Sequence, residues 1–142
     1  MTEQRGRQLA IDYGERRVGF AISDPSGMIA SPAGFLTRRP GKRPPIAAII
    51  ARATQLEATA LVFGLPLDEQ GEDTPRAQEV RTIAAEVTRR SGLPVRLVDE
   101  RFTTAAAHRA IREMSGTTRG RRGDVDALAA TILLQHALQL PG

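Results

Sequence analysis

Apolar and polar residues alternate at the start of the chain with the period of a β-strand. The alternation runs from residue 7 to 13 and predicts a first strand. A second apolar run at 18–23 predicts a strand that pairs back on the first, since Gly14 permits a turn between them. The turn sequence at 24–27 leads into a short third strand predicted at 28–30. The first thirty residues therefore predict an antiparallel meander.

Further along the chain, segments with the apolar spacing of a helix alternate with short apolar runs that are typical of strands. Short apolar runs at 60–64 and 94–100 predict two more strands. A threonine and proline at 74–75 are typical of a helix start, and the pair at 91–92 of a helix end. A last helix, apolar on most faces, is predicted from near Asp124. Three earlier helices are predicted from apolar stripes at helical spacing: Ile46, Ile49, Ile50, Ala53 and Leu56; Ala77, Val80, Ala84 and Val87; Ala107, Ala110, Ile111 and Met114.

This order of elements predicts an α/β fold. We expect a mixed five-stranded sheet, an antiparallel meander plus two parallel strands, with helices on both faces. Right-handed crossovers would place the parallel strands beside the first strand. The length suits one domain over residues 1–142. Within it we expect a flexible tail at 1–6 and a mobile basic loop at 115–123, where no apolar residue can anchor the chain.

Composition narrows the class of protein. The chain has no cysteine, which excludes a disulfide scaffold, a thiolate nucleophile and a cysteine zinc site. No apolar run suits a membrane span or a signal peptide, so a cytoplasmic protein without membrane contact is predicted. Of the 20 basic residues in a chain of net charge +4, Lys42 alone is not arginine. Arginine binds phosphate bidentately and stacks on bases, which favours a nucleic-acid partner, although a GC-rich genome would give the same bias.

Three acidic residues from separate segments are candidates for chemistry. Asp12 lies near the end of the first predicted strand, Glu100 at the end of the fifth and Asp126 at the start of the last helix. Taken singly, each has a structural explanation in a turn, an ion pair or a helix terminus. Together they would repel one another without a cation, and Mg²⁺ or Mn²⁺ prefers such oxygen ligands. An ion held there can activate water and stabilise charge on a phosphoryl group, which favours phosphodiester hydrolysis.

Four segments also carry a resemblance to a known family. LAIDYGERRVGFAISD, FGLPLDEQGEDTPRAQEVR, VDERFTTAAAHRAI and VDALAATILLQHAL occur in this order along the chain. Together they resemble the YqgF/RuvX family of Holliday junction resolvases and pre-16S rRNA processing nucleases, over about residues 8 to 139. The resemblance implies an RNase H-like fold and a metal-dependent nuclease. It also implies that Asp12, Glu100 and Asp126 are the catalytic acids and the ligands of Mg²⁺ or Mn²⁺.

Two further acids are secondary candidates for the site. Asp124 precedes Asp126 by two residues and is either a helix cap or a fourth ligand, and the cap is favoured. Neighbouring residues on a strand face opposite ways, so only one of Asp99 and Glu100 can point into the site. The resemblance favours Glu100.

Arginines near these acids are candidates for contacts with a nucleic-acid backbone. Arg17 and Arg101 could each reach a phosphate, or could pair with the neighbouring acids. The predicted mobile loop contributes three more candidates: Arg119, Arg121 and Arg122.

The function expected from the sequence is hydrolysis of phosphodiester bonds by a metal-dependent nuclease. The resemblance implies that it acts on the 5′ end of pre-16S rRNA during ribosome biogenesis. Two alternatives remain, a Holliday junction resolvase acting on branched DNA and a non-catalytic RNA-binding assembly factor. Single-stranded RNA, structured RNA and branched DNA are all candidate partners, because no motif specifies a base. The chain is expected to be a monomer or a homodimer, and junction cleavage would require the dimer.

Overall fold

Five strands and three helices make up the part of the chain that the structure describes. The computed structural model describes residues 6–39, 41, 43–101, 103 and 122–140, and only the backbone of 122–126. The elements are β1 (Arg7–Tyr13), β2 (Arg17–Ser23), β3 (Ala30–Thr37), α1 (Ile46–Gln55), β4 (Ala58–Leu65), α2 (Pro75–Ser91), β5 (Val95–Asp99) and α4 (Arg122–Gln139). The helix predicted around 107–114 and most of the predicted basic loop lie outside these residues.

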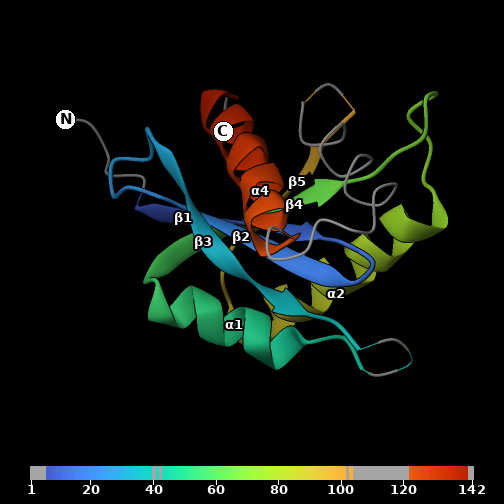
Figure 1. Ribbon diagram of the computed structural model, residues 1–142, viewed down its shortest axis with the longest axis horizontal. Coiled ribbons are helices and arrows are strands. Elements are labelled where there is room, and N and C mark those ends of the chain that lie inside the picture. The colour runs from blue at the N-terminus through green and yellow to red at the C-terminus, as the bar shows by residue number, and fades with distance from the viewer. Residues whose placement is uncertain (1–5, 40, 42, 102, 104–121, 141–142) are drawn as a thin grey trace.

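The strands form one mixed sheet in the order β3-β2-β1-β4-β5 (Figure 1). β1 pairs antiparallel with β2, and β2 antiparallel with β3. β4 lies parallel beside β1, and β5 parallel beside β4. The predicted meander with two parallel strands beside the first strand is therefore confirmed. Helix α4 covers one face of the sheet, and α1 and α2 cover the other.

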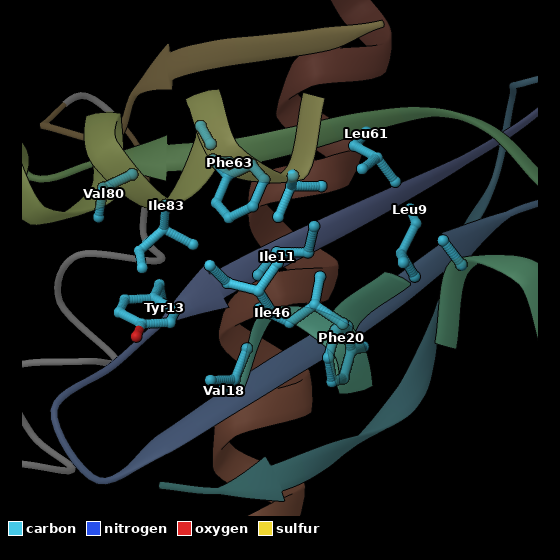
Figure 2. Packing of buried hydrophobic residues seen from close by; sticks show 14 of the residues in the cluster. Leu9, Ile11, Tyr13, Val18, Phe20, Ile46, Leu61, Phe63, Val80 and Ile83 are labelled. Carbon is cyan, nitrogen blue, oxygen red and sulfur yellow. The ribbon is translucent and has the colours of Figure 1, made fainter. Parts of the chain in front are cut away.

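Strand alternation divides the core between the two faces. Leu9, Ile11 and Tyr13 of β1 are fully buried against α1 and α2 (Figure 2). Ala10 lies on the opposite face, in a smaller cluster with α4. By the same alternation Asp12 lies on the α4 face. None of the helices that the structure describes is long and apolar enough to cross a membrane.

A third strand follows the turn as predicted, but its predicted bounds of 28–30 are wrong, because residues 28 and 29 lie in the loop before β3. Asp24 Oδ1 accepts hydrogen bonds from the backbone N–H groups of Met28 and Ile29, both at 2.8 Å. These bonds, after the still larger effect of the Ser26 hydroxyl, hold the pKa of Asp24 well below its usual range. β3 therefore begins only at Ala30, the last residue of the predicted segment.

Residues 31–37 of β3 were not predicted as strand because Pro32 and Gly34 are uncommon inside strands. The sheet tolerates both residues because β3 is an edge strand and its register with β2 shifts between Gly19 and Ala21. Gly34 takes the positive φ of +86° at this irregularity.

Helix α4 begins two residues earlier than the hydrophobic pattern predicted. Arg122 and Gly123 are helical rather than part of a loop, and Asp124 lies in the first turn rather than at the cap. The apolar period starts only at Val125, and a first turn without apolar residues carries no periodic signal. The predicted cap at Asp124 is therefore wrong.

Helix α2 begins and ends where the sequence predicted. Thr74 Oγ1 accepts a hydrogen bond of 3.0 Å from the Ala77 N–H, and Pro75 occupies the first turn. The same hydroxyl donates to the Pro66 carbonyl oxygen at 2.7 Å, which ties the helix to the loop after β4. Gly92 ends the helix in the left-handed conformation, with φ of 73°.

Replacing Thr74 by Ala is expected to lower the free energy of unfolding by about 1 to 2 kcal/mol, because one hydroxyl makes both bonds. Urea denaturation followed by circular dichroism measures this change. Thr82→Ala is the matched control on the same helix, since its exposed hydroxyl only donates to the Gln78 carbonyl oxygen. That variant should differ from wild type by no more than about 0.5 kcal/mol. Equal losses in the two variants would contradict the capping role.

Candidate active site

Asp12 lies in the middle of the sheet, on the face that α4 covers. Its exposed fraction is 2%, although it is a charged residue on a central strand. On one side its partner in the β1–β2 pair is Gly19. On the other side Ile11 is paired with Phe63, so the next residue of β4, Gly64, lies beside Asp12. A glycine therefore flanks this carboxylate on each neighbouring strand.

Glu100 reaches the same face from the far side of β4. Its backbone N–H donates to the Leu65 carbonyl oxygen at 3.4 Å, one residue beyond the end of β5. A Cβ atom on Gly64 would lie 2.6 Å from Glu100 Oε2 and 3.0 Å from Leu133 Cδ2. The Glu100 carboxylate thus lies over Gly64, next to Asp12, in the space that a side chain would fill. It is 2% exposed.

The backbone around Glu100 is fixed by its neighbours. Both the N–H and the hydroxyl of Thr103 donate to the Glu100 carbonyl oxygen, at 3.2 and 3.0 Å. Thr103 precedes the helix predicted around 107–114, whose residues the structure does not describe. In the part that is described, its contacts close a turn directly after the candidate ligand.

Asp99 points away from this site and pairs with Arg101. Its Oδ1 accepts from the Arg101 backbone N–H at 2.9 Å, and its Oδ2 accepts from Nε at 2.8 Å. Burial raises the pKa of Asp99, but the hydrogen bonds from Arg101 outweigh burial, and the pKa is lowered overall. Arg101 Nη1 also donates to the Glu69 carbonyl oxygen at 3.1 Å. This pair fastens the loop after β4 to the end of β5.

The third predicted acid, Asp126, is the fifth residue of α4. It precedes Ala130 and Leu133 by four and seven residues, the spacing of one helical stripe, and both of these residues are buried against the sheet. Its side chain is outside what the structure describes. Within the described residues, no group of three or more His, Cys, Asp or Glu side chains could hold a metal ion. The structure thus brings two of the three predicted acids together.

The structure places only some of the arginines that were predicted to bind phosphate. Arg17 begins β2 and lies on the α4 face, because Val18 after it packs into the opposite core. Arg122 opens α4, and its side chain is outside the described part. Arg119 and Arg121 are not among the described residues. One arginine, Arg17, is therefore placed on the same face as Asp12.

Two buried carboxylates side by side suit a hard divalent cation. Both offer oxygen donors, and neighbouring carboxylates repel one another unless a proton or a cation lies between them. The role of Gly64 was not predicted, because a glycine after an apolar run is too common to indicate a site. Only the pairing of β4 with β1 and β5 shows that this glycine makes room for the Glu100 carboxylate.

Comparison with solved structures shows the class of fold. The chain is similar to a structure described as "T. thermophilus RuvC in complex with Holliday junction substrate", with a TM-score of 0.56, 14% identity and coverage of 94% of each chain. A second structure of RuvC from the same organism gives a TM-score of 0.53, 15% identity and coverage of 93% of each chain. The protein therefore has the RNase H-like fold that the family resemblance implied.

The family follows from the sequence comparison. The model of the family described as "RuvX: Holliday junction resolvase" matches residues 6–140, and the chain belongs to this family. Several relatives are named "Putative pre-16S rRNA nuclease". The protein from Nocardioides sp. is 42% identical over 94% of this chain and 87% of its own length. Those from Roseiflexus sp. and Clavibacter michiganensis are 38% and 39% identical, over 97% and 94% of this chain and 97% and 83% of their own lengths.

Proposed function

We propose that this protein is a divalent-metal-dependent nuclease that hydrolyses phosphodiester bonds in the 5′-end processing of pre-16S rRNA. The names of the relatives support the reaction and the substrate, and the family's description supports the cleavage of phosphodiester bonds. The observation that carries the proposal is the placement of Asp12 and Glu100, both buried, on either side of Gly64 on one face of the sheet. Processing of pre-16S rRNA would place the protein in the cytoplasm, where ribosomes are assembled.

Asp12 and Glu100 would hold the cation, with Asp126 as the third ligand from α4. Mg²⁺ and Mn²⁺ both suit carboxylate oxygens and retain positions for water. When bound, such an ion lowers the pKa of water and stabilises negative charge on the phosphoryl group. The carboxylates would fix the position of the cation. The packing of α4 against the buried strands holds the carboxylates in place.

The residues around the acids would bind the substrate backbone. Glu100 fills the space over Gly64, but Gly19, on the other side of Asp12, contributes no side chain that would keep a phosphate away from the carboxylate. Arg17, on the same face, would contact a phosphate oxygen. Three arginines close to the third ligand in sequence would contact phosphates of the nucleic-acid strand beyond the site: Arg119, Arg121 and Arg122. Arg101 would join them only by giving up part of its contact with Asp99.

The experiment that tests the proposal compares three labelled substrates: a precursor segment containing the 5′ end of 16S rRNA, single-stranded RNA of unrelated sequence, and a four-way DNA junction. Each is incubated with Mg²⁺, with Mn²⁺ or with EDTA. We expect cleavage of the precursor RNA with either metal and none in EDTA, because the carboxylates cannot replace the charge of the cation.

Other outcomes separate the alternatives. Preferred cleavage of the junction, together with a dimer in sedimentation, would favour the resolvase function in the family's description. RNA binding without cleavage under every metal condition would favour an assembly factor. Cleavage that persists in EDTA would contradict a metal-dependent site.

A further inference from the structure

Phe35 is an exposed aromatic side chain on the same face of the sheet as the two acids. Among the residues that the structure describes, the large hydrophobic side chains that remain exposed are Met28, Ile29, Phe35 and Leu128. Phe35 is the aromatic one in this group, and it is 41% exposed. A single exposed apolar side chain is common on protein surfaces, so the placement of Phe35 near the acids, rather than its exposure, points to a ligand.

The irregularity in β3 decides which way Phe35 faces. Ala33 packs against the core on the α1 and α2 side, so regular alternation would point residue 35 to that side as well. Between Gly19 and Ala21 the register shifts by one residue, and Phe35 becomes the partner of Gly19. Leu36, next to it, packs against the α1 and α2 side. The extra residue therefore turns Phe35 to the α4 face.

This bulge is held in place from the other side of the sheet. Gly34 has a φ of +86°, which side chains rarely adopt, and a Cβ there would lie 2.9 Å from Arg52 Nη1. Arg52 Nη1 donates to the Ala33 carbonyl oxygen at 2.7 Å, and its guanidinium lies 4.7 Å from the centre of the Phe20 ring. Bulges of this kind commonly redirect a side chain beside an active site. The orientation of Phe35 is thus built into the fold.

Phe35 and Asp12 lie on one line across the sheet. Both are partners of Gly19, from β3 and from β1. Two strand spacings separate their Cα atoms, or roughly 10 Å. Gly19 between them has no side chain, so the sheet itself places no side chain between the ring and the carboxylate. One nucleotide can bridge such a distance, with its phosphate at the acids and its base at the ring.

We propose that Phe35 is a substrate-binding residue that stacks on an unpaired base next to the phosphate that is cleaved. This inference rests on the proposed nuclease function and specifies its substrate, a strand that is single-stranded at the point of cleavage. A base inside a continuous duplex already stacks on its neighbours and cannot stack on the ring. An aromatic platform accepts any base, because every base has a π-face, which agrees with the lack of any base-reading motif.

The first test measures binding, so that it does not depend on cleavage. The affinity of a fluorescently labelled single-stranded RNA is measured by anisotropy in EDTA for wild type and variants. Phe35→Ala and Phe35→Leu should bind about tenfold more weakly, because neither side chain offers an aromatic face. Phe35→Tyr should bind like wild type. Phe35→Leu keeps an apolar side chain, so the fold should be retained, and thermal melts verify the fold of each variant.

Abasic substrates give the decisive measurement. A series of RNAs, each lacking one base near the cleavage point, is bound to wild type and to Phe35→Ala. One abasic position should weaken binding by wild type about tenfold and leave Phe35→Ala unaffected. Met28→Ala is the control, since Met28 is 70% exposed but lies in the turn at the other end of β3. It should behave like wild type throughout.

The outcomes for the two proposals can be told apart. If Phe35→Leu binds as tightly as wild type, or if every abasic RNA affects wild type and Phe35→Ala equally, stacking by Phe35 is overturned, whether or not the protein cleaves. If the binding results are as expected but no substrate is cleaved, the nuclease proposal fails and the binding role of Phe35 stands.

Discussion

Replacing Asp12 by Asn is expected to reduce metal-dependent cleavage by at least about 100-fold while leaving the fold intact. Loss of a residue that merely supports a metal ligand already costs 10- to 100-fold, and Asp12 is proposed as a ligand itself. Asparagine has nearly the same shape, so the packing between β1 and α4 is retained, while the negative charge that attracts the cation is removed. The measurement is the initial rate of precursor-RNA cleavage with Mg²⁺ or Mn²⁺.

The structure offers a matched control for this variant. Asp99 is one residue from the proposed ligand Glu100, but its carboxylate binds Arg101 instead of facing Asp12. Asp99→Asn should therefore retain cleavage within a few-fold of wild type. Binding of RNA by Asp12→Asn in EDTA should also persist, because the proposed phosphate contacts come from arginines. Cleavage by Asp12→Asn at the wild-type rate would contradict the proposed mechanism.

Replacing Gly64 by Ala is expected to impair both stability and cleavage. The added Cβ would lie 2.6 Å from Glu100 Oε2 and 3.0 Å from Leu133 Cδ2, so the carboxylate has to move. Crowding of this kind in a packed interior costs about 1 to 3 kcal/mol of the free energy of unfolding. A ligand displaced by about 1 Å can reduce the rate by roughly 100-fold. Urea denaturation and cleavage rates measure the two effects.

A double-mutant cycle shows whether the Glu100 side chain is the cause. In a Glu100→Ala background the space over Gly64 is vacated, so the Gly64→Ala substitution should cost less stability than in wild type. The cost that remains would come from Leu133. Equal costs in the two backgrounds would show that the carboxylate does not occupy the space above Gly64.

Local patterns in the sequence determined most of the secondary structure. The strand at 7–13 and the helix from Pro75 to Ser91 were predicted with their bounds, because alternation, the Thr74 cap and the Gly92 stop depend on residues close together in the chain. The order of elements then left few ways to arrange one sheet, and the predicted arrangement is the observed one. Recognition of the acids needed the resemblance as well, because each has an ordinary structural explanation when taken alone.

The extent of edge strand β3 could not be predicted from these patterns, although a third strand was expected there. Pro32 and Gly34 argue against a strand in sequence, and only pairing with β2 and the contact from Arg52 stabilise one there. The orientation of Phe35 depends on the same bulge and could not be derived from spacing along the chain.

The sequence by itself determined the order of the strands, the meander and the two crossovers, because these depend on residue type and on periods of a few residues, whereas the choice of the acids as candidates also needed the family resemblance. The tertiary structure decided which side chains share a face. Strand register placed Gly19 and Gly64 beside Asp12, set the Glu100 carboxylate over Gly64 and turned Asp99 away toward Arg101. Register is a relation between strands far apart in the chain, and a shift of one residue would reverse every one of these placements.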